Sequence, residues 1–160
     1  MKILSIDSGL QRTGYAIIKK SDNKVEFLSS GLVTTDKSKS LMSRIQSVYS
    51  TIEILIKKFK PSIVVLEQLF FLKNKKTAIA VSQVQGAVIL LCAQNKLKLT
   101  FLTPLQVKQT ITGYGYADKQ AMKKMIHLTL SETKKISQDD IIDAIAIGVA
   151  YCYLEKNLLR

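Results

Sequence analysis

The segment KILSIDSGLQRTGYAIIK, residues 2–19, opens the chain with two apolar runs joined by a glycine-containing turn. Gly9 and Gly14 are turn signals, because glycine adopts backbone conformations that other residues disfavour. A third run follows a further turn signal at Asp22-Asn23. These patterns predict three successive strands, at residues 2–7, 13–19 and 24–34. The short connections indicate that the strands pair as an antiparallel meander.

Helical and strand patterns alternate through the rest of the chain. Apolar residues recur every three or four positions from Leu41 to Phe59, which predicts an amphipathic helix that Pro61 ends. The stretch at 77–94 is apolar on more than one face, so this helix is either buried or in contact with a partner, such as a second copy in a homodimer. The other predicted elements are strands at 62–67 and 97–102, helices from Thr103-Pro104, at 119–130 and at 139–154, and a polar connector at 132–138.

This order of elements predicts an α/β fold with a five-stranded mixed β-sheet flanked by α-helices. The length of 160 residues suits one domain, residues 1–160, with a sizeable core. Cys92 and Cys152 lie inside apolar helical patterns without metal-ligand spacing, so we interpret them as reduced core residues.

The charge balance points to a polyanionic partner. Twenty-four Lys and Arg against twelve Asp and Glu give a net charge of +12, which favours nucleic acid over a merely solvated surface. The sequence contains no run of about 18 apolar residues that would span a membrane, and it opens with a strand pattern rather than a signal peptide. We therefore expect a cytoplasmic protein that does not bind a membrane.

Four carboxylates stand at the edges of strongly apolar segments, where an uncompensated charge is costly. Asp7 closes the first strand, Glu67 closes the fourth, and Asp140 and Asp143 open the last helix, where positions i and i+3 share a face. If all four converge, divalent cations must neutralise them. Oxygen-only ligands suit Mg²⁺, or Mn²⁺ in its place, and two such ions form the clamp used for displacement at phosphorus.

Each acid taken alone also has a structural interpretation. Asp7 could serve as a turn residue, Glu67 could pair with a lysine, and Asp140 could belong to a capping box with Ser137. Asp143 is harder to explain structurally, because it lies in the most apolar part of its helix. Asp139 forms a competing i, i+4 pair with Asp143, so spacing alone does not choose between Asp139 and Asp140.

Several motifs follow one another across nearly the whole chain. They are Asp7-Ser8-Gly9 with Thr13-Gly14-Tyr15, then Glu67-Gln68 with Phe70, then Gln106-Val107-Lys108-Gln109, and finally Asp140-x-x-Asp143-Ala144-x-Ala146. In this order they resemble the RuvC family of bacterial Holliday-junction resolvases. The resemblance implies an RNase H-like fold, a homodimer, and Mg²⁺-dependent paired nicking of four-way junction DNA. It also implies that the acidic ligands are Asp7, Glu67, Asp140 and Asp143, and that RuvA and RuvB are partners in branch migration.

The resemblance also assigns roles to basic and aromatic residues. Lys108 and Lys119 match lysines that the family places near the active site and the scissile phosphate, although Lys119 could equally be a solvated first-turn lysine. Phe70 matches an aromatic thought to stack on bases at the junction core, while either Phe70 or its neighbour Phe71 could pack inward. Lys73, Lys75 and Lys76 would suit phosphate contacts in the same loop. We interpret His127 as a packed helix residue.

Three other functions compete with junction resolution. The Asp7-x-Gly9 motif also resembles the first phosphate loop of actin-like ATPases, but those proteins need a second lobe. A RuvC-like nuclease of ribosomal RNA maturation would have the same fold and similar acids, and a basic binding module without catalysis would keep the acids only as remnants. The family commonly carries Pro where this chain has Ser8, a change that removes no ligand.

Overall fold

The computed structural model describes residues 1–22, 24–69 and 75–158, without the side chains of residues 75–77 and 156–158. Five strands form one sheet in the order β3-β2-β1-β4-β5. The strands are β1 (Lys2–Asp7), β2 (Arg12–Ser21), β3 (Lys24–Thr34), β4 (Ile63–Glu67) and β5 (Lys98–Leu102). β1, β2 and β3 pair antiparallel, while β4 lies parallel to both β1 and β5. The predicted meander and mixed α/β sheet are confirmed.

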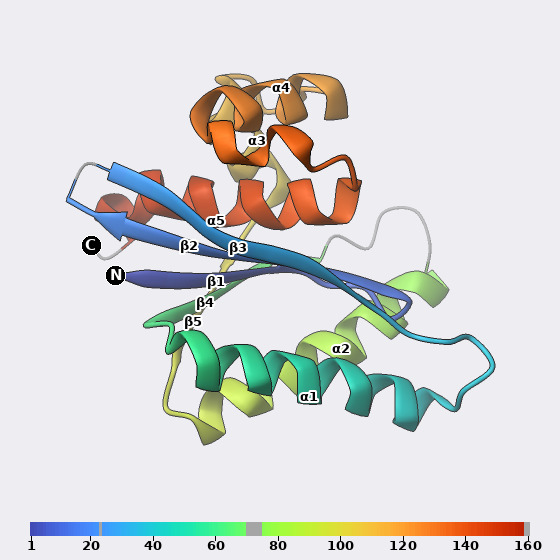
Figure 1. Ribbon diagram of the computed structural model, residues 1–160. Helices are drawn as coiled ribbons and strands as arrows, with labels where there is room; N and C mark the ends of the chain where they lie inside the picture. The colour runs from blue at the N-terminus through green and yellow to red at the C-terminus, as the bar shows by residue number, and fades with distance from the viewer. Residues whose placement is uncertain (23, 70–74, 159–160) are drawn as a thin grey trace.

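Helices cover both faces of the sheet (Figure 1). One face carries α1 (Leu41–Phe59) and α2 (Lys75–Gln94). The other carries α5 (Asp139–Leu158), with α3 (Pro104–Thr112) and α4 (Lys119–Thr129) stacked outside it. No helix among the described residues is long and apolar enough to cross a membrane.

Several predicted boundaries need correction. β2 extends one residue earlier and two residues later than predicted, and α5 continues to Leu158 rather than ending at 154. The predicted polar connector contains a 3₁₀ helix, Ser131–Lys135. The buried Thr133 hydroxyl donates to the carbonyl of Leu130 at 2.7 Å and so supports this turn by a local bond that hydropathy alone does not reveal. The predicted start of α3 is confirmed by a capping box between Thr103 and Gln106.

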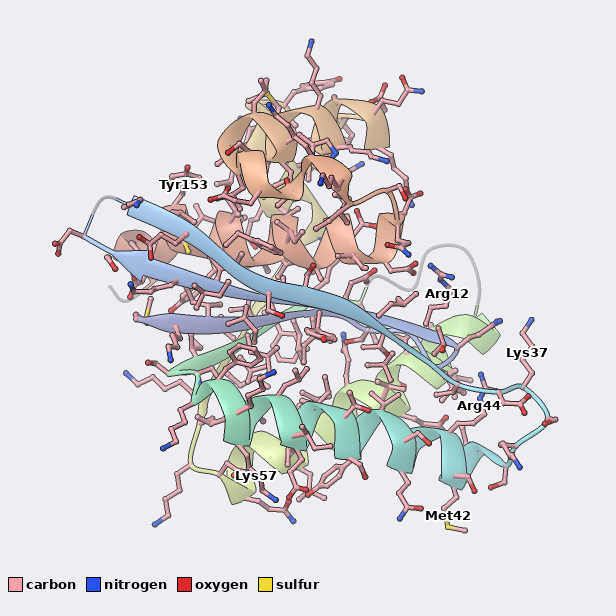
Figure 2. All side chains as sticks on the ribbon, in the orientation of Figure 1. Arg12, Lys37, Met42, Arg44, Lys57 and Tyr153 are labelled. Atoms are coloured by element: carbon pink, nitrogen blue, oxygen red, sulfur yellow. The ribbon has the colours of Figure 1, made fainter. Side chains whose placement is uncertain are left out.

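α5 lies unusually close to the central strands because small residues meet at the contact. Ser5 of β1 donates a buried hydrogen bond of 2.6 Å to the carbonyl of Ala144. A Cβ added at Gly14 would overlap the backbone carbonyl of Asp140, and one at Gly148 would come within 2.6 Å of the Ser5 hydroxyl oxygen. In Figure 2, Arg12 lies toward the end of the sheet where α5 begins, and Tyr153 lies toward the opposite end of the sheet.

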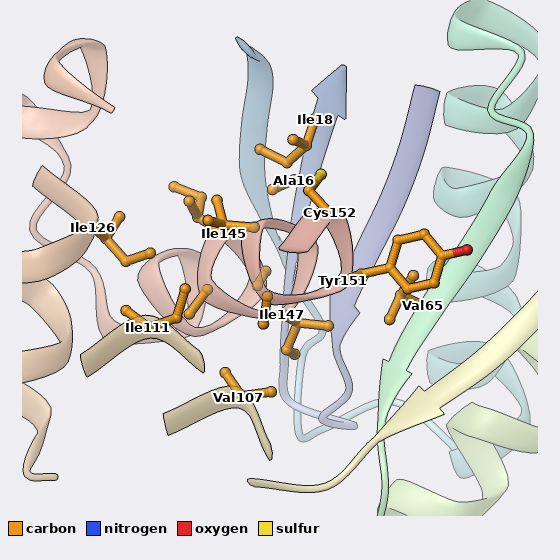
Figure 3. Close-up of a cluster of buried hydrophobic side chains, with 14 of the residues drawn as sticks. Ala16, Ile18, Val65, Val107, Ile111, Ile126, Ile145, Ile147, Tyr151 and Cys152 are labelled. Carbon is orange, nitrogen blue, oxygen red and sulfur yellow. The ribbon is translucent and has the colours of Figure 1, made fainter. Parts of the chain in front are cut away.

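Two hydrophobic cores lie on the two faces of the sheet. One joins β1 and β4 to α1 and α2, and includes Cys92. The other joins the sheet to α3, α4 and α5, and includes Cys152 (Figure 3). Both cysteines are free and buried, which confirms that they are core residues. The stacked arrangement leaves the carboxyl ends of β1 and β4 beside the first turns of α5.

Candidate active site

The parallel pairing of β1 and β4 places two acids at one edge of the sheet. Ile6 is the register partner of Leu66, so Asp7 and Glu67 both follow at the carboxyl ends of strands about 4.8 Å apart. The end of β4 is held on both sides. Gln68 N–H donates to the Leu102 carbonyl and the buried Gln85 side chain of α2 donates to the Glu67 carbonyl, both at 2.8 Å.

The first turns of α5 bring the other two acids to the same edge. Asp7 is the register partner of Gly14, and the Asp140 carbonyl packs directly on Gly14. The Ser5–Ala144 hydrogen bond then fixes the next turn of the helix against β1. Asp140 and Asp143 therefore lie beside the strand that carries Asp7, although more than 130 residues separate them along the chain.

The pKa values show that these carboxylates act on one another. Burial, followed by repulsion from Asp143, Glu67 and Asp140, raises the pKa of Asp7 to about 7. Burial and repulsion from Asp143 raise the pKa of Glu67 to about 7, and burial is the main cause of the raised pKa of Asp143. Four acids from three separated segments of the chain therefore influence one another's pKa at one edge of the sheet.

Two lysines lie beside the acids. A cavity of about 160 Å³ is lined by Glu67 and Asp143 together with Lys108 of α3 and Lys119 of α4. Lys119 Nζ lies 3.3 Å from Asp139 and 3.8 Å from Asp143, whose negative charge is the main reason that the pKa of Lys119 is raised. Lys108 lowers the pKa of Glu67, opposing the burial. The two lysines predicted from the sequence thus lie at the cavity.

Arg12 pairs with Asp140. Its Nη2 and Nε lie 2.7 and 2.8 Å from the same carboxylate oxygen, Oδ2. The guanidinium therefore compensates the charge of Asp140 while leaving the second oxygen outside this contact. Sequence reasoning missed Arg12, since its partner lies 128 residues away and no spacing rule joins them. Gln85 was also missed, because one glutamine in an apolar helix is no signal by itself.

The donor set fits a divalent cation, although the side chains are not drawn into a ligand shell. Among the described residues, no three His, Cys, Asp or Glu side chains come close enough together to form a metal-ligating group. Two of the acids instead lie next to basic groups, Asp140 beside Arg12 and Asp143 beside Lys119. The carboxylates supply only oxygen donors, and the neighbouring Ser8 hydroxyl is buried with no hydrogen-bond partner in the described part of the chain. Hard cations such as Mg²⁺ suit these donors.

The structure also bears on the remaining predicted residues. Asp140 contributes to the raised pKa of Asp7, whereas Asp139 is 61% exposed and faces Lys119. His127 is half-buried on α4, with Nδ1 3.0 Å from the Thr133 hydroxyl, which agrees with a packing role. Phe70, Phe71 and Lys73 lie outside the described residues. Lys75 and Lys76 begin α2, but their side chains also lie outside the description.

Comparison with known proteins gives the family. The model of the family described as crossover junction endodeoxyribonuclease RuvC matches residues 3–151. The chain belongs to the RuvC family. A RuvC of Thermosipho melanesiensis is 42% identical over 152 residues, covering 95% of this chain and 96% of the relative. That of Caldanaerobacter subterraneus is 36% identical over 160 residues, covering 100% and 97%.

Solved RuvC structures share the fold. The structure of Thermus thermophilus RuvC in complex with Holliday junction substrate matches with a TM-score of 0.91 and 23% identity, covering 98% of this chain and 96% of that one. This likeness confirms the RNase H-like fold that the motifs implied. The scaffold of this chain is thus shared with a protein of distant sequence.

Asp7→Asn should stabilise the metal-free protein at pH 8. A carboxyl whose pKa is raised on folding opposes folding when ionised, so its penalty grows between the unfolded-state pKa near 4 and the folded-state value of about 7. We expect the free energy of unfolding to rise by roughly 1 to 3 kcal/mol relative to wild type at pH 8, allowing for water in the open cavity, and by less at pH 5. Urea denaturation in EDTA at both pH values measures it.

Asp36→Asn is the matched control for this substitution. The Asp36 carboxylate accepts hydrogen bonds from the backbone and hydroxyl of Ser38, at 2.8 and 2.7 Å, and these bonds lower its pKa. Its neutralisation should not stabilise the protein at pH 8. An equal or larger gain from Asp36→Asn, or no gain from Asp7→Asn, would contradict the electrostatic account of the acidic site.

Proposed function

We propose that this protein is a Holliday junction resolvase, which makes paired, symmetric nicks in opposite strands of four-way DNA junctions during recombination and repair. The observation that carries the proposal is the acidic edge, where Asp7, Glu67, Asp140 and Asp143 share one electrostatic site beside Lys108 and Lys119. Membership in the RuvC family supports the substrate and the reaction. On this proposal residues 1–160 act as one nuclease domain in the cytoplasm.

The four acids are the proposed metal ligands. The four carboxylates would bind two Mg²⁺ ions, or Mn²⁺, and the raised pKa values of Asp7 and Glu67 fit a site whose repulsion a cation relieves. Bound there, the ions would activate water and stabilise the leaving oxygen. Arg12 holds Asp140 at the edge of the site by its ion pair.

The two lysines of the site would contact and stabilise the scissile phosphate. Lys119 is 71% exposed, so its ammonium group is able to contact an incoming scissile phosphate as well as Asp143. Lys108 lines the cavity next to Glu67 and adds positive charge where the transition state becomes more negative. The net charge of +12 supplies the wider attraction to the DNA backbone.

A homodimer fits both the substrate and the surface of α2. A four-way junction needs two cuts, so two copies of one active site are required for paired nicking. α2 presents a stripe at helical spacing that consists of Ile79, Gln83, Gly86 and Leu90. Ile79 and Leu90 are 57% and 54% exposed, and a Cβ at Gly86 would meet nothing within 4 Å. A second copy would bury this stripe. The RuvA and RuvB branch-migration proteins are further proposed partners.

The first experiment compares substrates. With Mg²⁺, a synthetic four-way junction should be nicked at symmetric positions in opposite strands, while a linear duplex of the same sequence stays intact. Folded RNA of similar size serves as a third substrate, because a RuvC-like nuclease of ribosomal RNA maturation would cut it in preference. Equal cleavage of junction and duplex, or cleavage of RNA alone, would refute the resolvase proposal.

Asp143→Asn separates cutting from binding. We expect it to lower the cleavage rate by roughly 10²- to 10³-fold, since it removes one charged ligand. Junction affinity in Ca²⁺ should persist, because binding comes from lysines and counterion release rather than from the acids. Gel-shift and cleavage assays on one preparation measure both quantities, with Asp36→Asn as control. Joint loss of binding and cutting would assign Asp143 a structural role.

The dimer proposal predicts that a charged residue introduced on α2 disrupts the dimer. Leu90→Arg should shift the protein from dimer to monomer in sedimentation velocity, since burial of the added charge is costly. Leu128→Arg on α4 is the matched control, because Leu128 is 67% exposed on the opposite layer of the sheet. A wild-type protein that sediments as a monomer at micromolar concentration, or equal effects of the two substitutions, would rule out this interface.

A further inference from the structure

Two tyrosines stand exposed on the loop between α3 and α4. Tyr114 and Tyr116 are 62% and 76% exposed, although burying such rings is normally favourable. Their ring centroids are 5.9 Å apart, with the ring planes tilted by 58°. The two rings therefore form one aromatic surface on the outside of the molecule, which we call the tyrosine pair.

The loop that carries the pair is tightly braced. α3 ends at Gly113, which adopts the left-handed backbone conformation with φ of 77°. The Gln109 side chain donates to the Gly113 carbonyl at 2.8 Å, and the Thr112 hydroxyl donates to the Tyr114 carbonyl at 3.0 Å. The Ala117 N–H donates to that same carbonyl at 3.1 Å. These bonds fix the backbone, so little conformational entropy remains to be lost when the rings bind a ligand.

The far side of the loop is also anchored. Ala117 is 7% exposed, and Asp118 caps α4 by accepting the Ala121 N–H at 2.8 Å. A Cβ at Gly115 would come within 3.1 Å of the Leu105 side chain, so the backbone between the two tyrosines lies against α3. The pair is thus displayed by a loop whose remaining residues are used for packing and capping.

The tyrosine pair adjoins the candidate active site. Lys108 and Lys119, which line the acidic cavity, lie on the two helices that this loop joins. Three peptide units separate Tyr116 from Lys119, so their Cα atoms are at most about 11 Å apart. Successive phosphates of a duplex strand advance about 3.4 Å along the helix axis, so the backbone that carries the rings lies within the length of a few nucleotides from the Lys119 backbone.

We propose that Tyr114 and Tyr116 stack on nucleobases of the DNA strand next to the scissile phosphate, and that this contact stabilises the junction at the active site. The inference rests on the proposed function and adds a binding element to the same site. Exposed aromatic rings beside lysines are the combination that proteins use to hold unpaired bases, because every base has a π-face. Bases near a branch point lie next to a break in regular stacking, which lowers the cost of pairing them with a protein ring.

A double substitution tests the proposal on the intact protein. Tyr114→Ala/Tyr116→Ala should weaken binding of a four-way junction in Ca²⁺ by roughly 5- to 100-fold, the range measured for loss of base stacking. Tyr114→Phe/Tyr116→Phe keeps the rings and should stay within about twofold of wild type, since stacking needs no hydroxyl. Tyr153→Ala is the matched control, because Tyr153 is 54% exposed but lies toward the other end of α5 (Figure 2).

Salt dependence distinguishes stacking from charge. The slope of log affinity against log salt should be unchanged in the tyrosine-to-alanine variant, whereas Lys119→Ala should reduce the slope by about 1. A 2-aminopurine base placed beside the cleavage position should be quenched by wild type and by the phenylalanine variant, and recover its fluorescence with the alanine variant. Together these results would establish stacking on a base.

Other outcomes would overturn the inference. If the tyrosine-to-alanine variant binds the junction within twofold of wild type, the pair does not contact DNA. A protein partner would then be the remaining ligand for the exposed rings. An equal loss from Tyr153→Ala would show that the effect is not local. If wild type itself fails to prefer a junction over a duplex, the proposed function fails. If wild type keeps that preference and the tyrosine-to-alanine variant matches it, only the stacking role fails.

Discussion

The close contact between α5 and the central strands is the constraint on which the acidic site depends. Gly14 leaves room for the Asp140 carbonyl, and Ser5 ties the Ala144 carbonyl to β1 by a buried hydrogen bond. A larger residue at Gly14 or Gly148 would push the helix outward, because both positions already have neighbouring atoms where a Cβ would lie. Packed interiors absorb such strain poorly. The helix start would then move away from Asp7, so the geometry of the acidic site is built into the hydrophobic core.

The electrostatics of the site complement this packing. Folding forces carboxylates together and raises the pKa of Asp7 and Glu67 to about 7, while Arg12 and Lys119 take up part of the negative charge. The positively charged side chains thus neutralise part of the negative charge that the proposed metal ions would otherwise have to neutralise. A fold stabilised by its own basic side chains is able to form before metal arrives, and metal binding then relieves repulsion that folding created.

The two faces of the sheet serve different purposes in this proposal. The α3–α4 layer contributes Lys108, Lys119 and the tyrosine pair, all within one continuous segment beside the cavity. The α1–α2 layer offers the α2 stripe, with the exposed Ile79 and Leu90, to a second copy. The tyrosine pair and the α2 stripe therefore lie on opposite sides of the sheet, so a substitution in one should leave the other intact.

The sequence by itself determined the order of the elements and showed that acids stand at the edges of apolar runs, because period and composition are local properties. Strand pairing followed from short turns and buried strands. Tertiary structure alone decided that Arg12 meets Asp140 and that Gln85 holds the Glu67 carbonyl, and it showed that Asp140 contributes to the raised pKa of Asp7. These contacts join residues on different elements, and they depend on how closely α5 and α2 approach the sheet, which is set by packing of side chains that no single segment encodes.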